Sequence, residues 1–121
     1  MKKDVEAALL ECATDPAAGT ATGRFRFDPE LPIFAGHFPG RPLVPGIYFV
    51  EMARTLAERL RGTRFELASI RDARFTAQLG PDQTATAEVT LHDVDDGVRC
   101  DGTVRTDDGD AGRLKLLLRA L

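Results

Sequence analysis

The feature that most constrains the fold of this chain is an abrupt change in proline and glycine content after residue 46. Residues 29–46 contain five prolines and three glycines, which exclude a regular helix or a central strand over this stretch. Residues 47–61 contain neither, and their apolar side chains cover more than half of a helical circumference. The sequence therefore predicts a long ordered loop that leads directly into a largely buried helix, from about Ile47 to Arg61, ending at Gly62.

Beyond this helix the hydrophobic period changes to two. Apolar side chains alternate strictly with threonine and glutamate over residues 84–91, and the Asp-Gly pairs at 96–97 and 108–109 are hairpin signals. Four consecutive antiparallel strands are predicted, at 66–79, 84–91, 98–105 and 113–121. Residues 5–13 have the spacing of a short N-terminal helix and residues 20–28 that of a first strand. One helix with a meandering sheet is an α+β fold, in which the sheet can wrap around the helix.

Length and composition narrow the function classes. A chain of 121 residues is expected to form one domain over residues 1–121. A net charge of −3 argues against general nucleic-acid binding. The apolar runs are far shorter than the ~20 residues needed to cross a bilayer, and Asp4 and Glu6 interrupt the place of a signal-peptide core, so a cytoplasmic protein without a membrane segment is expected. Cys12 and Cys100 lack metal-ligand spacing and are expected to be small buried side chains, with no metal site.

The candidate functional residues lie in segment 34–51, which reads FAGHFPGRPLVPGIYFVE. The glycines and prolines around His37 suit a rigid loop that holds one side chain in one orientation, although a lone loop histidine also fits a structural role. Glu51 lies in the apolar half of the helix, where a partly desolvated carboxylic acid suits a general acid. Alternatively, it belongs to a solvated stripe with Arg54. Gly46, at the helix start, offers a free backbone N–H to a carbonyl oxygen that gains negative charge.

The motif G-H-F-P-G-x-P-x-x-P-G, followed by four residues and an acid, resembles the signature of the 3-hydroxyacyl-acyl-carrier-protein dehydratases. The likeness includes the spacing from His37 to Glu51 and covers roughly residues 25–92. It implies a hot-dog fold, in which an antiparallel sheet wraps a central helix and two chains pair as a homodimer. It also implies dehydration of carrier-bound 3-hydroxyacyl thioesters to trans-2-enoyl thioesters in fatty acid or polyketide-type biosynthesis, with no metal or organic cofactor.

The same resemblance assigns roles to single residues. His37 would remove the C2 proton, and Glu51 of the other chain would be the acid that assists departure of the 3-hydroxyl. The Gly46 N–H would support the thioester oxygen, and Phe38 is placed with Gly46 in substrate binding. Acyl carrier protein is the implied partner. Because carrier proteins are acidic, the six arginines between residues 54 and 74, with Arg41, form the expected docking patch.

Two alternatives stay open on the sequence. A hot-dog thioesterase binds the same thioesters, and a carboxylate can activate water as readily as it protonates a hydroxyl. The histidine loop favours dehydration, since hydrolysis needs no base aimed at C2. A non-catalytic hot-dog subunit that binds acyl carrier protein is the other alternative. Retention of both His37 and Glu51 argues against it.

Overall fold

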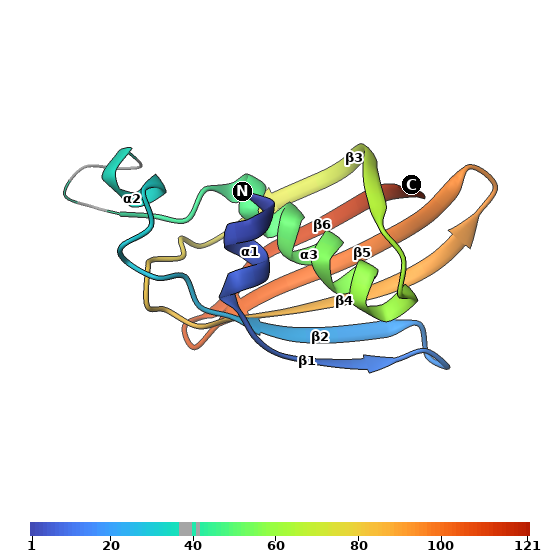
Figure 1. The fold of residues 1–121 in the computed structure, drawn as a ribbon, viewed down its shortest axis with the longest axis horizontal. Helices are drawn as coiled ribbons and strands as arrows, with labels where there is room; N and C mark the ends of the chain where they lie inside the picture. The colour runs from blue at the N-terminus through green and yellow to red at the C-terminus, as the bar shows by residue number, and fades with distance from the viewer. Residues whose placement is uncertain (37–39, 41) are drawn as a thin grey trace.

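A single long helix lies against the concave face of a six-stranded antiparallel sheet (Figure 1). The structure is a computed structural model that describes residues 1–36, 40 and 42–121. The elements in chain order are α1 (Lys2–Ala8), β1 (Leu9–Asp15), β2 (Thr20–Phe25), α2 (Ile33–Gly36), α3 (Gly46–Arg61), β3 (Phe65–Phe75), β4 (Ala85–Val94), β5 (Gly97–Thr106) and β6 (Gly109–Ala120). The α+β class and the hot-dog arrangement expected from the sequence are confirmed.

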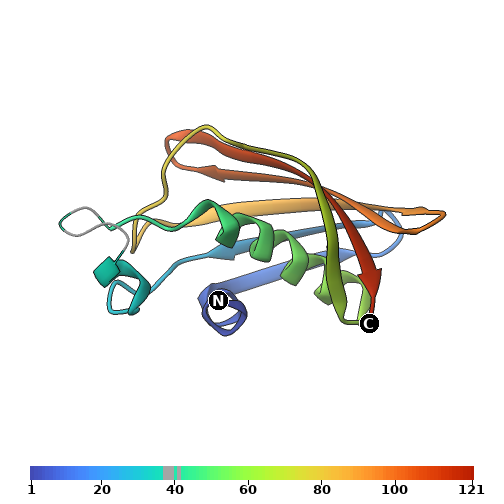
Figure 2. The ribbon, with the colours of Figure 1, turned by 90° about the horizontal axis from the view of Figure 1, so that it is seen from above.

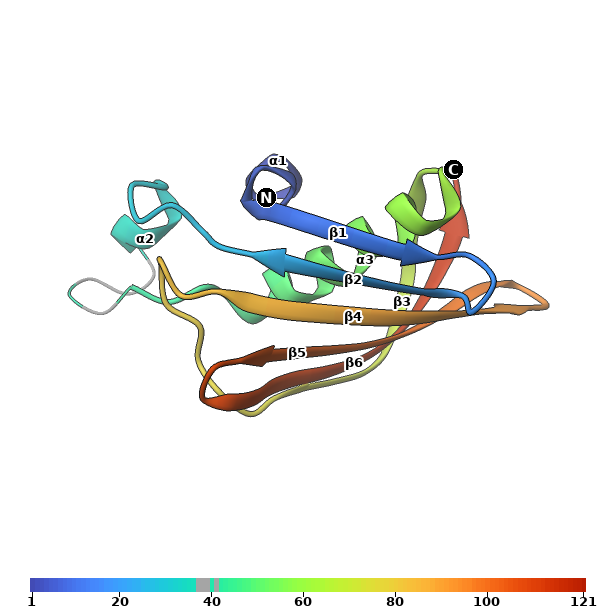
Figure 3. The ribbon, with the colours of Figure 1, turned by 90° about the horizontal axis from the view of Figure 1, so that it is seen from below.

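The sheet has the strand order β1-β2-β4-β5-β6-β3, and it curls around α3 (Figures 2 and 3). Strands β4, β5 and β6 form the predicted meander, joined at the two Asp-Gly pairs. The expectation that β3 continues this order next to β4 is wrong, because β3 pairs with β6 at the far edge of the sheet. Residues 76–84 then carry the chain back to β4, a crossing that local sequence patterns do not encode.

The N-terminal segment differs from its prediction. Its helix ends at Ala8, and Leu9 begins a strand, so the helix predicted over 5–13 is wrong in its second half. Pairing explains the difference, because β1 lies antiparallel to β2 with Cys12 opposite Gly23, and ladder hydrogen bonds outweigh a weak helical propensity. Cys12 is consequently only partly buried.

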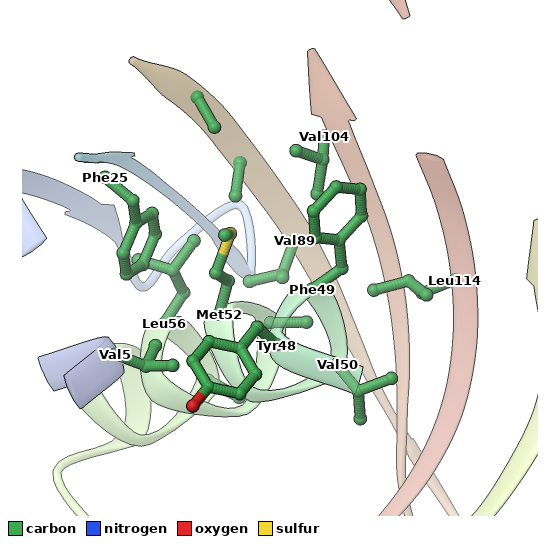
Figure 4. Packing of buried hydrophobic residues seen from close by; sticks show 14 of the residues in the cluster. Val5, Phe25, Tyr48, Phe49, Val50, Met52, Leu56, Val89, Val104 and Leu114 are labelled. Carbon is green, nitrogen blue, oxygen red and sulfur yellow. The ribbon is translucent and has the colours of Figure 1, made fainter. Parts of the chain in front are cut away.

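The helix α3 matches its prediction to within one residue. Gly62 ends it in the left-handed conformation, at a φ of 63°, and donates its N–H to the Glu58 carbonyl at 2.8 Å. Its apolar side chains pack among those of the strands (Figure 4). Cys100 lies in this core, fully buried as expected, and burial raises the pKa of its thiol to about 12. Among the described helices none is long and apolar enough to cross a membrane.

The loop before α3 contains one helical turn, α2, around the buried Phe34. No regular helix was expected between residues 29 and 46, so this short element is an addition to the prediction. Pro32 precedes it, and prolines are tolerated where a helix starts because the first N–H groups lack intrahelical partners. Residues 37–39 and 41 lie outside the described part of the chain.

We expect the two hairpin glycines to differ in their tolerance of a side chain. Both have positive φ, 152° at Gly97 and 118° at Gly109, where alanine costs about 1 to 3 kcal/mol. A Cβ on Gly97 would also collide with the Leu118 carbonyl oxygen, whereas nothing lies within 4 Å of one on Gly109. Urea denaturation should therefore give a larger loss of unfolding free energy for Gly97→Ala than for Gly109→Ala. Equal losses would contradict the close approach of the β4–β5 turn to β6.

Candidate functional site

The start of α3 is an open helix end beside a small apolar hollow. Pro45 precedes the helix in an extended conformation, and none of the described side chains caps it. The Tyr48 N–H donates to the Pro45 carbonyl at 3.0 Å, whereas the N–H groups of Gly46 and Ile47 have no acceptor within the helix. A hollow of about 150 Å³ lies here, lined by residues that include Val44, Gly46, Phe49 and Phe75. A Cβ on Gly46 would come within 2.8 Å of the Phe75 ring. Glycine at this position therefore lets the Phe75 ring pack directly against the start of the helix.

Glu51 lies just over one turn into α3, on the buried side of the helix. It is 8% exposed, and of the charged residues that the structure describes it alone is buried. Most of its neighbours along the helix are core residues, such as Val50 and Met52. An ionisable group is rarely buried without a partner, because removing a charge from water is costly.

The partner of Glu51 is Arg54, one turn further along α3. The Arg54 Nε donates to Oε2 of Glu51 at 3.1 Å, and Nη2 donates to Oε1 at 3.0 Å and to Oε2 at 2.7 Å. The side chains of Arg54 and Glu51 are only 15% and 10% exposed. The alternative that Glu51 belongs to a solvated stripe with Arg54 is thus half right, since the two residues do pair but the pair is shielded from solvent.

The same face of α3 holds the first residue of β3. Arg54 Nη1 donates to the Phe65 carbonyl at 2.9 Å, and the Phe65 N–H donates to Oε2 of Glu58 at 2.8 Å. Glu58 also lies 3.6 Å from the Lys2 ammonium of α1. The three charged residues of this face, Glu51, Arg54 and Glu58, are called the polar stripe below. Their spacing was visible in the sequence, but their contacts with Phe65 and Lys2 depend on the tertiary fold.

The structure describes two of the four predicted site residues, and the roles of all four stay predictions. It places Gly46 and Glu51 on α3, at the helix start and just over one turn later. His37 and Phe38 lie outside the described residues, so their roles stay predictions. Within the described ranges, no three His, Cys, Asp or Glu side chains lie close enough to hold a metal ion.

We expect the Glu51–Arg54 pair, at 2.7 Å, to contribute far more to the unfolding free energy than an exposed pair of similar length. Arg54→Met leaves a buried carboxylate without its partner and should lower the unfolding free energy by about 3 kcal/mol. The control is Arg24→Met, which removes a 3.0 Å ion pair with Glu11 whose side chains are 48% and 65% exposed. That loss should stay below about 1 kcal/mol. Urea denaturation measures both, and similar small losses would mean that water reaches Glu51 freely.

Comparisons with known proteins agree with this architecture. The family model described as ApeI dehydratase matches residues 13–109, well over half of the chain. Among curated proteins, the 3-hydroxyacyl-acyl-carrier-protein dehydratase FabZ of Latilactobacillus sakei is 31% identical over 85 residues. The one from Ligilactobacillus salivarius is 33% identical over 84 residues. Each match covers 64% of this chain but only 61% and 60% of those relatives' length.

Solved structures show the same fold. The dehydratase heterocomplex ApeI:P from Xenorhabdus doucetiae superimposes with a TM-score of 0.78 at 24% identity, covering 92% of this chain and 96% of that one. A hypothetical thioesterase with coenzyme A from Streptococcus pneumoniae gives 0.71 at 9% identity, covering 98% and 92%. The fold is therefore shared by proteins with different described activities. Because the family model spans most of the sheet and the whole of α3, the chain belongs to the ApeI-like dehydratase family.

Proposed function

We propose that this protein dehydrates 3-hydroxyacyl thioesters bound to acyl carrier protein, giving trans-2-enoyl thioesters. The observation that carries the proposal is Glu51, a buried carboxylate in the more apolar first half of α3, at the motif spacing from His37. A charge is kept inside a core at a cost to stability, and such groups are concentrated at functional sites. Membership of a dehydratase family and the relatives named FabZ support the same reaction.

The proposed chemistry uses the three parts of the motif. His37 removes the proton on C2, which the adjacent thioester carbonyl acidifies. Glu51 faces the 3-hydroxyl that leaves. The open helix start at Gly46 supplies N–H groups to the thioester oxygen as it gains negative charge, with Phe38 in substrate binding. No step needs a metal or an organic cofactor, because the electrons of the broken C2–H bond form the new double bond.

The proposed active form is a homodimer with shared sites. Strand β3 is an edge of the sheet in a single chain, and it exposes Ile70 and Phe75 at 44% and 49%. Pairing two such edges about a two-fold axis would extend the sheet and cover these side chains. In that dimer each site takes His37 from one chain and Glu51 from the other. The Xenorhabdus dehydratase is a heterocomplex, so a different hot-dog chain is the competing partner for this edge.

Hydrolysis of the thioester is the second candidate, and one observation favours it. Arg54 holds three hydrogen bonds to Glu51, and a cation stabilises the carboxylate form that activates water. Both reactions can be followed at once on a 3-hydroxyacyl thioester. Enoyl absorbance without free thiol supports dehydration, and free thiol without enoyl product supports hydrolysis.

The catalytic pair gives the direct test. His37→Ala and Glu51→Gln should each lower kcat for dehydration by about 10²-fold to 10⁴-fold, the usual cost of losing a group that moves or positions a proton. Glu11→Gln, an exposed carboxylate on β1, is the control and should keep kcat unchanged. The double variant should be little worse than the worse single one, because both groups act on one transition state. Retained activity in either single variant would remove that residue from the mechanism.

Mixing the two inactive variants extends this test to the dimer. Heterodimers of His37→Ala and Glu51→Gln would hold one site with both residues intact and one with neither. Activity should return when the two variants exchange subunits. Separately, sedimentation of the parent protein at micromolar concentration should show no monomer. Exchange without recovered activity would place both residues of a site in one chain. A monomer that gains activity only with a second protein would favour the heterocomplex.

The expected docking patch for acyl carrier protein is tested by a separate set of variants. Arg71 and Arg74 are exposed on β3, and Arg41 lies outside the described residues. Changing Arg41, Arg71 and Arg74 to Glu should raise KM for a carrier-bound substrate, because an acidic carrier would then meet like charge. KM for a small soluble thioester should stay the same. Arg105→Glu, on the exposed side of β5, is the control. Equal losses on both substrates would rule out docking at this patch.

A further inference from the structure

The hollow at the start of α3 has walls that are fixed by hydrogen bonds. On one side the Val44 N–H donates to the Leu79 carbonyl at 2.7 Å, which ties the residues before the helix to the segment that follows β3. On the other side the Thr76 N–H donates to the Ala111 carbonyl at 2.9 Å, and the Thr76 hydroxyl donates to the Asp110 carbonyl at 3.2 Å. Walls held in this way keep their place when one side chain of the lining changes size.

The lining of the hollow is almost entirely apolar. Among the described residues it includes Leu43, Pro45, Phe49 and Ala77, and Gln78 supplies the one polar side chain. An apolar cavity of about 150 Å³ takes a molecule the size of benzene, with its six carbon atoms. The hollow has this volume. Pockets for whole ligands are larger, at about 300 to 1,000 Å³, so the hollow suits one short hydrocarbon segment of a ligand.

Phe75, the last residue of β3, is the lining residue that limits the size of the hollow. Its ring packs edge-to-face on Phe49, with 5.6 Å between the ring centroids and 79° between the ring planes. Three of its ring atoms lie 2.8 to 3.1 Å from the place that a Cβ on Gly46 would take. Because Phe75 is 49% exposed, replacing it removes little buried surface and should leave the core intact.

The hollow adjoins the place where the proposed function puts the thioester oxygen. The N–H groups of Gly46 and Ile47 have no acceptor within the helix, and Gly46 itself lines the hollow. A thioester whose oxygen binds these N–H groups has its acyl chain beside the hollow. Burial of each CH₂ group there would strengthen binding, because apolar surface leaves water.

We propose that this hollow binds the acyl chain of the substrate and that Phe75 is the specificity-determining residue that limits the length of that chain. The inference rests on the proposed function and names its substrate class, which is short-chain and medium-chain 3-hydroxyacyl thioesters. A space for about six carbon atoms beyond C3 gives a longest fitting acyl chain of about nine carbons. Carbon atoms beyond that number would meet the Phe75 ring.

Binding of acyl pantetheine amides of increasing chain length tests the inference without catalysis. In these probes nitrogen replaces the sulfur and C3 carries no hydroxyl, so neither dehydration nor thioester hydrolysis can consume them. Calorimetry on the parent protein should show Kd falling by about fourfold for each added CH₂, the gain expected from burying it. This decrease should stop at about nine carbons.

Two substitutions of Phe75 should move this limit by different amounts. In Phe75→Ala, Kd should go on falling for about four to six further carbons, because the ring that is removed is as large as the group that the hollow holds. Phe75→Leu should add about one to three carbons. For 3-hydroxyacyl thioesters of the same lengths, kcat/KM for enoyl formation should move in parallel. Circular dichroism confirms that each variant is folded.

Ile70→Ala is the matched control. Ile70 lies on the same strand, is 44% exposed and pairs with the buried Leu116, but it does not line the hollow. The substitution removes a similar contact with a second chain, so the chain-length limit should stay at the value of the parent protein. Sedimentation of the Phe75 and Ile70 variants shows whether either one weakens the dimer.

The outcomes separate this inference from the proposed function. An unchanged limit in Phe75→Ala, with or without a weaker dimer, would overturn the inference, and so would the same shift in Ile70→Ala. An equal change in Kd at every chain length would place the pantetheine side of the probe in the hollow, which also overturns it. A parent protein that forms no enoyl thioester, but whose binding limit still moves with Phe75, would overturn the proposed dehydration and leave the acyl site standing.

Discussion

The burial of α3 against the concave face of the sheet is the interaction on which the rest of the structure depends. It brings the apolar side chains of the helix among those of the strands, and together they form one continuous core. The approach is close because glycines face the helix at two places. A Cβ on Gly23 would lie 2.6 Å from Leu56, and one on Gly112 would lie 3.0 Å from Phe49. Larger residues there would push the sheet away from the helix.

Because α3 is buried on most sides, the charged side chains that it carries need partners within the protein. The side chains of the polar stripe find these partners in each other and in Phe65. Arg54 donates to Glu51 and to the Phe65 carbonyl, and Glu58 accepts from the Phe65 N–H. These contacts also attach the first residue of β3, which leaves α3 after only three residues. The candidate catalytic carboxylate is therefore part of the structural attachment of an edge strand. Arg54 therefore contributes both to the surroundings of Glu51 and to the position of β3.

This coupling bears on how a shared active site would be assembled. Strand β3 is an edge of the sheet, and it exposes Ile70 and Phe75, the side chains that the proposed dimer would cover. An arginine that spans from the helix to the first residue of β3 fixes that edge relative to Glu51. A rigid element is a better platform for a catalytic group than a loop, because it holds the group within a fraction of an ångström.

The sequence by itself determined the local features of this protein. The change from a proline-rich stretch to a glycine-free and proline-free one located α3, and Asp-Gly pairs located the hairpins, because these signals act within a few residues. The spacing of His37 and Glu51 pointed to the family for the same reason. Only the tertiary structure decided that β3 crosses to β6, that Leu9 starts a strand, and that Arg54 joins Glu51 to Phe65. These depend on contacts between residues distant in sequence, whose free energies no local pattern records.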